Sequence, residues 1–287
     1  PADAEYLHYG YCKTIDNIPM TPDGKPTPAL LTKTALESAS IPHLTINAGS
    51  KITPQLPFIE TGLSFGKNIS VEPAMTDSEV SSAVEYGRIV GRNMASLTDC
   101  LVIGESIPGG TTTALAVLKA FDFDAKTSSS IPTNPIKLKN EVVDSAIKRI
   151  DSDHPYSILA KVGDPMIAFV AGMLSSASAV SKVMLAGGTQ MTAVLAFASK
   201  IGFNEENTAI GTTSYITNDQ NANFANLVKQ IADIPAISVN PGLNNSKYSG
   251  LKAFSEGFGK EGAGAGGSII SSMLKTGNDS AKFLNLA

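Results

Sequence analysis

The sequence contains few of the side chains that form disulfides or bind metals. Its 287 residues include only two cysteines, Cys12 and Cys100, without a CxxC spacing, and three histidines without an HxH or HExxH pattern. This usage argues against a disulfide scaffold, a zinc site or a histidine-based metal centre. We therefore expect a protein of the reducing cytoplasm with no bound metal and no cofactor.

Strong charge and long apolar runs are also missing. Charged residues make up 17% of the chain and the formal net charge is -4, so no basic surface is expected to bind nucleic acid or an anionic membrane. The longest apolar windows, such as 166–174, fall well short of the ~20 residues that a membrane-spanning helix needs. The chain begins at Pro1 without a methionine or a signal-peptide pattern, and we expect any missing residues to precede it. The expected partner is a small, soluble ligand.

Hydrophobic residues make up 43% of the chain, enough for a large core. Short apolar runs alternate with longer helical patterns, which is typical of βαβ units in a mostly parallel sheet. We predict an α/β fold with helices on both faces of the sheet, a Rossmann-like three-layer arrangement, in one domain over 1–287. Residues up to about 40 and the C-terminal helices could form a small helical subdomain. The predicted strands are 43–49, 99–105, 181–188, 207–213 and 236–240.

Several helix starts can be placed from capping residues. Thr76 followed by Glu79 forms a capping-box pattern for a helix that runs to about Ser96. Asn134 and Asp164 each precede a proline suited to the first turn of a helix, and we predict that each caps one. Residues 121–135, with three consecutive serines and two prolines, are predicted to form a long loop near the carboxyl edge of the sheet.

The predicted strands repeatedly end in turns rich in glycine and threonine. These turns are GESIPGGTTT at 104–113, GGTQM at 187–191 and GTTS at 211–214. The carboxyl ends of parallel strands converge at one edge, where open sheets bind ligands, so the three turns are expected to face a common site. Their composition favours an anionic or hydroxyl-rich ligand.

The turn at 104–111 is similar to a Walker loop but lacks its lysine. Gly110 occupies the lysine position, so nothing neutralises the β and γ phosphates of a nucleotide, and Glu105 adds negative charge. A nucleoside triphosphatase is therefore excluded. Enzymes that use phosphoribosyl diphosphate carry two adjacent acids before their glycines. Only Glu105 is present here, which weakens the case for a magnesium-bound donor.

A monophosphate fits this turn better. The N–H groups of Gly109, Gly110 and Thr111, with threonine hydroxyls, could hold it at the positive end of the following helix, leaving Glu105 free for other chemistry. The alternative is that the glycines only permit a tight turn and that Glu105 is solvated. We favour the functional interpretation because this carboxylate leaves a buried strand.

The stretch GFGKEGAGAGGSIISSML at 257–274 is the second unusual feature. It could be a flexible linker, but it is short and lies between two helical patterns. We predict that its small residues let backbone approach a ligand at the start of a helix over 268–274. Glu261 is a candidate for a working carboxylate, and spacing alone does not decide between this role and a structural one.

Other candidates have simple structural explanations as well. Gly187 and Gly188 could serve only tight strand-to-helix packing, and the Thr-Gln pair after them could cap a helix instead of contacting a ligand. Lys161 and Lys182 could neutralise a phosphate, although most lysines are solvated surface charges.

Four strings connect the chain to a known family. They are GESIPGGTTTAL, VGDPMIAFVAG, LAGGTQMTAVLA and KEGAGAGG. Through them the chain resembles the nicotinate-nucleotide:dimethylbenzimidazole phosphoribosyltransferase family of cobalamin biosynthesis, most closely its archaeal branch, and the similarity extends over nearly the whole chain.

The characterised bacterial members of that family match less closely. Their two loops read roughly GEMGIGNTT and LGEGSGA. The matching positions are Gly104, Glu105, Thr111 and Thr112 in the first loop and Glu261, Gly262, Gly264 and Ala265 in the second. Residues 106–110 differ, Lys260 replaces a glycine, and Ala186-Gly187-Gly188 replaces Asp-Gly-Phe, a departure that bears on ribose or phosphate contacts.

The resemblance implies a reaction that needs no metal. A base such as 5,6-dimethylbenzimidazole attacks C1′ of nicotinate mononucleotide, nicotinate leaves, and an α-ribosyl monophosphate forms with inversion. Glu261 would take the proton from the ring nitrogen of the incoming base, and Glu105 would orient that base and favour positive charge at the ribosyl carbon. The phosphate is expected at 109–112 or 264–268, because both precede helices. The candidate substrate-binding residues are Gly104, Gly109, Gly110, Thr111, Thr112, Gly187, Gly188, Thr189, Gly262, Gly264, Gly266 and Ser268.

The resemblance also implies a homodimer, and two other functions stay open. The chain could be a nucleotide or cobamide-precursor binding protein that keeps the fold without the chemistry, which the altered residues 106–110 favour. It could also be a phosphoribosyltransferase that uses phosphoribosyl diphosphate and magnesium.

Overall fold

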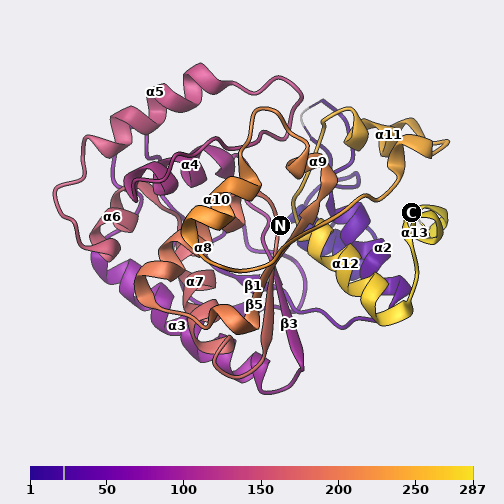
Figure 1. Ribbon diagram of the computed structural model, residues 1–287, viewed down its shortest axis with the longest axis horizontal. Coiled ribbons are helices and arrows are strands. Elements are labelled where there is room, and N and C mark those ends of the chain that lie inside the picture. Colours follow the sequence, from indigo (N-terminus) through magenta and orange to yellow (C-terminus); the bar gives the residue numbers. More distant parts are fainter. Residues whose placement is uncertain (22, 287) are drawn as a thin grey trace.

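A parallel sheet forms the centre of the fold (Figure 1). The computed structural model describes residues 1–21 and 23–286. The strand order is β3-β4-β5-β6, and each neighbouring pair is parallel. The strands are β3 Cys100–Gly104, β4 Lys182–Ala186, β5 Thr208–Thr213 and β6 Ala236–Val239.

The two inner strands are buried along most of their length. All residues of β4 after Lys182 are buried, and so are all residues of β5 except Ala209. A parallel strand covered by helices on both faces is continuously apolar rather than alternating, which explains the run Val183 to Ala186. The outer strands β3 and β6 are more exposed.

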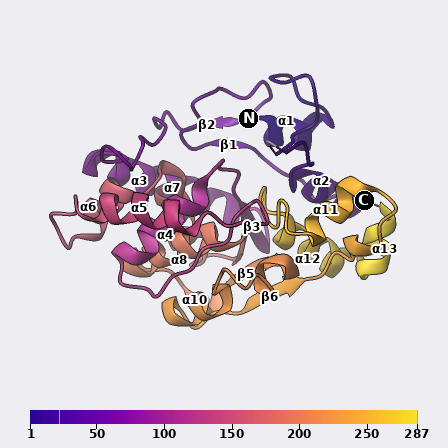
Figure 2. The same cartoon turned by 90° about the horizontal axis from the view of Figure 1, so that it is seen from above.

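Helices from the middle of the chain cover one face of the sheet and form the larger hydrophobic cluster (Figure 2). Helices α3 and α7 pack so closely that a side chain on Gly87 or Gly172 would overlap the backbone of the other helix. The helices of this layer are α3 Asp77–Ala95, α4 Gly110–Ala120, α5 Ile136–Ile147, α6 Pro155–Val162, α7 Pro165–Ala177, α8 Thr189–Ile201 and α10 Phe224–Ile231.

Helices from the two ends of the chain cover the other face. A second hydrophobic cluster joins Leu31 and Ile269 to Met184 of β4 and Val239 of β6, so this layer packs on the sheet itself. The grouping of these helices as a subdomain stays a prediction. They are α2 Ala29–Ser38, α11 Ser249–Ser255, α12 Ala265–Thr276 and α13 Ser280–Leu286.

Shorter elements complete the described part of the chain. They are helices α1 Ala2–Tyr9 and α9 Ser214–Thr217, strands β1 Ile46–Asn47 and β2 Ile59–Glu60, and 3-10 turns Glu205–Asn207 and Leu243–Asn245. Over residues 1–21 and 23–286, no helix has the length and apolar character required to cross a bilayer.

The predicted α/β class, with helices on both faces of a parallel sheet, is confirmed, and so are four of the five predicted strands. The strand predicted at 43–49 is largely wrong. Only Ile46–Asn47 is a strand, and it pairs with Ile59–Glu60 in a separate two-stranded sheet. Leu44 is 67% exposed, and Gly49 turns the chain with a φ of 99°, so the extended segment stays short.

The predicted helix caps are confirmed in two cases of three. Thr76 and Glu79 form the capping box of α3, and Asp164 caps α7. The capping role predicted for Asn134 is wrong, because its side-chain amide donates to the carbonyl of Thr127 at 2.9 Å. It therefore holds the 121–135 loop together, and α5 begins at Ile136 without a side-chain cap.

Candidate active site

The loop after β3 and the loop before α12 meet at the carboxyl edge of the sheet. A Cβ built on Gly104 would lie 2.9 Å from the Cα of Gly264. Gly264 also has a φ of 72°, which favours glycine. Only glycine fits both positions, and the chain segments that carry Glu105 and Glu261 therefore lie side by side.

Glu105 is the first residue after β3, and its carboxyl group is buried. The residue is 6% exposed, and the N–H of Ile107 donates to Oε2 at 3.0 Å. Burial raises the pKa of Glu105 to about 7; hydrogen bonds from Gln190 and Ile107 oppose this rise, and the negative charges of Glu261 and Asp3 add to it. The carboxyl group therefore titrates closer to neutral pH than an exposed glutamate does.

The carboxylate of Glu261 accepts four hydrogen bonds. Its Oε2 accepts from the N–H of Thr213 at 2.8 Å and the hydroxyl of Thr212 at 3.1 Å. Its Oε1 accepts from the N–H groups of Gly266 at 3.0 Å and Gly262 at 3.2 Å. Burial raises the pKa of Glu261, and the four donors act against that rise. A carboxylate has about four acceptor positions, so a further partner must displace a donor.

The turn after β4 contacts both glutamates. A Cβ built on Gly187 would lie 3.9 Å from Oε1 of Glu105, and one built on Gly188 would lie 3.4 Å from the Cβ of Glu261. The charge of Glu261 also raises the pKa of Glu105. The structure thus brings residues of all three glycine- and threonine-rich turns together with the 257–274 stretch.

Helix α4 begins in a turn that is open to an anion. Gly109 precedes the helix with a φ of 72°, and no side chain caps this end. The N–H groups of Gly110 and Thr112 make only long bonds to backbone carbonyls, of 3.4 and 3.3 Å. Poorly satisfied N–H groups at the positive end of a helix favour an anionic ligand.

The start of α12 already holds a carboxylate. The N–H groups of Gly262 and Gly266 donate to Glu261, and the N–H of Ser268 donates to the carbonyl of Gly264 at 2.9 Å. A phosphate at this turn would compete with Glu261 for the same donors. The two turns expected to hold a phosphate therefore differ. The donors at the α12 turn are already bonded to Glu261, whereas the N–H groups of Gly110 and Thr112 at the α4 turn make only long bonds.

Helix α8 begins at Thr189 without a side-chain cap, with Gly188 before it. The alternative in which Thr189 or Gln190 caps this helix is therefore wrong. The side chain of Gln190 bonds to Glu105 instead. Thr189 is buried at the edge of the same site.

The two lysines considered as phosphate counterions lie away from the glutamates. Lys161 pairs with Asp151 at 3.1 Å. Lys182 is the first residue of β4, at the end opposite the glycine turn, and it donates to the side chain of Asn207 at 2.7 Å. Both lysines therefore already have polar partners, and neither bonds to the glycine turns.

A buried charge cluster lies beside the site and was not predicted from the sequence. Lys260 and Asp219 form an ion pair at 2.9 Å, and both side chains are less than one-tenth exposed. The hydroxyl of Ser128 donates to Asp219 at 2.6 Å, and the buried Lys139 donates to the carbonyl of Ser128 at 2.5 Å. Burial and the nearby Lys260 lower the pKa of Lys139 to about 8, although Asp219 opposes the shift.

Only one member of this cluster carried a signal in the sequence. Lys260 stands where the family pattern has glycine, which marks it as unusual, but Lys139 and Asp219 look like ordinary helix and loop charges. Two buried ammonium groups face one buried carboxylate, so the cluster carries an excess positive charge whenever Lys139 is protonated.

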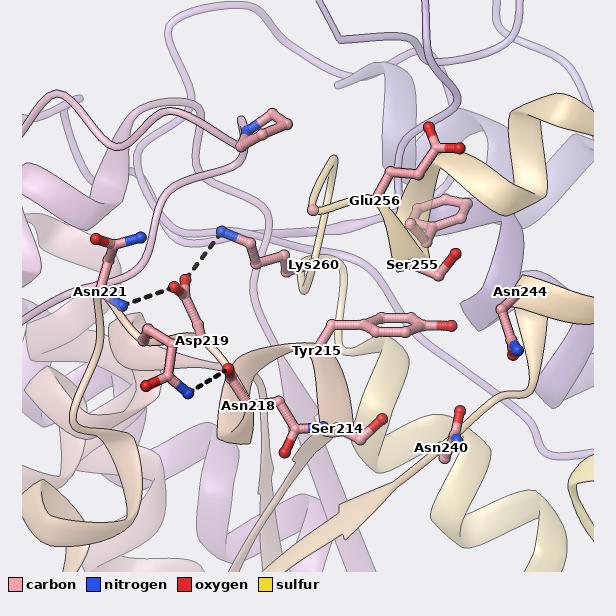
Figure 3. A pocket seen from close by; sticks show the side chains of 14 residues that line it. Ser214, Tyr215, Asn218, Asp219, Asn221, Asn240, Asn244, Ser255, Glu256 and Lys260 are labelled. Atoms are coloured by element: carbon pink, nitrogen blue, oxygen red, sulfur yellow. Dashed lines mark hydrogen bonds and ion pairs between the residues drawn. The ribbon is translucent and has the colours of Figure 1, made fainter.

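A cavity of about 500 Å³ opens beside Lys260, beyond the ends of β5 and β6 (Figure 3). Tyr215 and Phe254 form apolar parts of its wall, and neither Glu105 nor Glu261 lines it. Its size is in the range of small-molecule sites. The carboxamides along its wall belong to Asn218, Gln220, Asn221, Asn240 and Asn244.

Comparison with known proteins agrees with this architecture. Residues 42–215 match the family model described as Phosphoribosyltransferase. UPF0284 proteins of Archaeoglobus fulgidus and Sulfurisphaera tokodaii are 45% and 42% identical to this chain, in alignments that cover 99% and 96% of it and 81% and 79% of those proteins.

Two solved structures from Thermus thermophilus share the fold. One is a nicotinate-nucleotide-dimethylbenzimidazole phosphoribosyltransferase, with a TM-score of 0.64 and 17% identity over 90% of this chain and 72% of that one. The other, called CobT, has a TM-score of 0.65 and 16% identity over 99% and 75%. The family model covers more than half of the chain and the UPF0284 relatives nearly all of it. The chain therefore belongs to the phosphoribosyltransferase family that includes the UPF0284 proteins.

Proposed function

We propose that this protein transfers the phosphoribosyl group of nicotinate mononucleotide to a benzimidazole-type or other aromatic base. The products are nicotinate and an α-ribosyl monophosphate for the lower ligand of a cobamide. The observation that carries the proposal is that Glu105 and Glu261 lie on loops that pack together at the carboxyl edge of the sheet, close enough for the charge of Glu261 to raise the pKa of Glu105. The family supports a transferase, and the name of one Thermus structure supports this donor and acceptor.

In this proposal the donor phosphate binds between the start of α4 and the buried lysines. The helix dipole and the excess charge of Lys139 and Lys260 both favour an anion there. The hydroxyl of Thr127 donates to the carbonyl of Thr111 at 2.9 Å, which connects the α4 turn to the loop that contacts Lys139. The N–H groups of Gly109, Gly110, Thr111 and Thr112 are the proposed backbone donors.

The proposed reaction is a displacement at C1′ of the ribose. A ring nitrogen of the base forms the new bond to C1′, the bond from C1′ to the pyridinium nitrogen breaks, and its electron pair stays on nicotinate. The base loses its ring proton to Glu261. Because Glu261 has four donors, the incoming N–H replaces the one with the longest bond, that of Gly262 at 3.2 Å.

Glu105 has a different role in the proposed mechanism. The pyridinium of the donor and the ribosyl carbon both carry positive charge, which favours the ionised form of a nearby carboxyl group. With a pKa of about 7 in the free protein, Glu105 ionises readily when the donor binds. It then orients the base and stabilises the charge that develops at C1′.

The decisive experiment mixes the protein with nicotinate mononucleotide and 5,6-dimethylbenzimidazole and measures release of nicotinate. Release is expected in wild type and in Glu141→Gln, whose side chain is exposed on α5, and is expected to be abolished in Glu261→Gln. Normal turnover in Glu261→Gln would remove Glu261 from the mechanism. No release with any tested base would contradict the activity.

A second candidate is a binding protein without catalysis. It is favoured by the four donors around Glu261, which leave that carboxylate no free acceptor position. Calorimetry separates the two candidates, because heat of nucleotide binding without product, over several bases, would support a binder.

The third candidate uses phosphoribosyl diphosphate and magnesium. It predicts strict dependence on magnesium, since the diphosphate leaving group needs a divalent cation. Nicotinate release that continues in the presence of a chelator would exclude it.

We also propose a cytoplasmic homodimer. Cys12 and Cys100 are both free thiols, which suits a reducing compartment, and the family resemblance suggests two subunits. Light scattering coupled to gel filtration measures the mass, and a monomer at assay concentrations would contradict the dimer.

A further inference from the structure

The N-terminal helix α1 contacts the loop that carries Glu105. Asp3, on this helix, accepts a hydrogen bond from the hydroxyl of Ser106 to Oδ2 at 2.6 Å. Ser106 directly follows Glu105, in the part of the loop that departs from the bacterial pattern. The other oxygen of Asp3, Oδ1, accepts from the hydroxyl of Thr27 at 2.6 Å. Asp3 thus links the loop that carries Glu105 to the segment that leads into α2.

Helix α1 is anchored independently of the candidate site. Glu5 is fully buried, and its carboxylate accepts from the N–H groups of Lys13, Thr14 and Gln55 and from the hydroxyl of Thr14 at 2.8 to 2.9 Å. Burial alone would raise the pKa of Glu5, but these donors lower it to about 2. The carboxylate is therefore ionised and bound at all working pH values, and α1 is a fixed support for Asp3.

The same N-terminal region contacts the loop that carries Glu261. The hydroxyl of Thr32, buried in α2, donates to the carbonyl of Ala263 at 2.9 Å. Ala263 has a φ of 50°, which is unfavourable for a residue with a side chain, so an external contact is needed to hold this backbone. A Cβ built on Gly262 would lie 3.5 Å from Pro28, the residue before α2. One region therefore supports both glutamate loops.

We propose that Asp3 is a positioning residue, which acts through Ser106 and Thr27 to set the placement of Glu105 relative to Glu261. Through Ser106, Asp3 holds the loop that carries Glu105. Through Thr27, Asp3 holds the segment that leads into α2, the helix that contacts the loop carrying Glu261. The proposal rests on the proposed function, because it assigns a role within that reaction.

Asp3 also acts on Glu105 through its charge. The charged groups that raise the pKa of Glu105 are Glu261, from the loop before α12, and Asp3, from α1. Burial, Glu5 and then Asp3 raise the pKa of the Cys12 thiol. Removing the charge of Asp3 therefore moves the titration of Glu105 to lower pH, whereas a purely structural residue would leave that titration in place.

Two substitutions separate the charge of Asp3 from its contacts. Asp3→Asn keeps the shape and removes the charge, and we expect the pH midpoint of Glu105, followed by NMR of isotope-labelled glutamate carboxyl carbons, to fall. Asp3→Ala removes both hydrogen bonds, and we expect kcat to fall by about 10- to 100-fold while KM for the donor changes little. Asp16→Asn, an exposed aspartate of the same region, is the matched control and is expected to behave as wild type.

A double-mutant comparison tests the path through Ser106. If Asp3 acts through this hydroxyl, Asp3→Ala and Ser106→Ala together reduce kcat by no more than the larger single effect. A lower melting temperature with unchanged kcat and an unchanged Glu105 midpoint would overturn the proposal, and so would fully additive losses. If wild type releases no nicotinate, the proposed function fails by itself, and the Glu105 titration still decides whether Asp3 acts on this carboxyl group.

Discussion

The backbones of Gly104 and Gly264 touch at the carboxyl edge of the sheet and leave no space for a side chain on either residue. This contact joins the segments of Glu105 and Glu261, which lie far apart in the sequence. Because packed interiors resist displacement, the placement of the two carboxyl groups depends on this pair of glycines.

A methyl group on Gly264 is expected to separate the two glutamate loops. Gly264→Ala combines a left-handed φ of 72° with contacts to Gly104 and Ala186. Gly277 has a φ of 68° with no atom within 4 Å of a built Cβ, so Gly277→Ala is the matched control for the strain alone. In urea denaturation, the free energy of unfolding of Gly264→Ala should fall by about 1–3 kcal/mol more than that of the control. Equal losses would mean that the contact is not tight.

Glu105 is expected to destabilise the folded protein as the pH rises. Its folded pKa of about 7 lies above the ordinary value of 4.5. Between these values the folded state binds more protons than the unfolded state, so the free energy of unfolding decreases with pH. In Glu105→Gln the free energy of unfolding should depend less steeply on pH, because the contribution of Glu105 is gone while that of Glu261 remains. Urea unfolding at about pH 5 and about pH 8 measures the difference, and parallel curves for both proteins would contradict the raised pKa.

The activity should show the opposite dependence on pH. The proposed role of Glu105 requires the ionised form, so kcat/KM for nicotinate release should rise with pH through about 7, the pKa of the free protein. In Glu105→Gln the remaining activity should be low and lack this rise. A wild-type profile that falls across the same range would show that the protonated form is the active one.

Lys139 is expected to contribute to donor binding rather than to the chemical step. Lys139→Met removes a buried ammonium group next to the proposed phosphate position, and KM for nicotinate mononucleotide should rise by about 10-fold or more with little change in kcat. Lys137, on the same helix, has a side chain that is 93% exposed, so Lys137→Met is the control. Inorganic phosphate should compete with the donor in wild type. Equal KM values in both variants would place the phosphate elsewhere.

The ion pair of Lys260 and Asp219 should behave as one coupled unit. Lys260→Met leaves the buried Asp219 carboxylate without its ammonium partner, and a loss of about 3 kcal/mol in the free energy of unfolding is expected. Adding Asp219→Asn should recover part of this loss, because the carboxylate that lost its ammonium partner is then replaced by a neutral amide. If the two losses simply add, the groups do not interact.

Local patterns predicted the elements whose causes lie close together in the sequence. The capping box of Thr76 and Glu79 and the cap of Asp164 involve neighbours within one helical turn, and both were correct. The causes of the errors lie more than one helical turn away along the chain. The strand at 43–49 depends on pairing with Ile59–Glu60, and the side chain of Asn134 bonds within its loop instead of capping α5.

By itself, the sequence determined the α/β class, the four strands of the main sheet and the glycine turns that carry Glu105 and Glu261. These follow from apolar periodicity and turn composition, which are local properties of the chain. Only the tertiary structure decided that four donors surround Glu261, that Lys139 and Lys260 face a single Asp219, and that Asp3 reaches Ser106. The bonds of Thr212 and Thr213 to Glu261, of Lys260 to Asp219 and of Ser106 to Asp3 join distant segments. The burial that shifts the pKa values of Glu261 and Lys139 exists only once those segments have packed together.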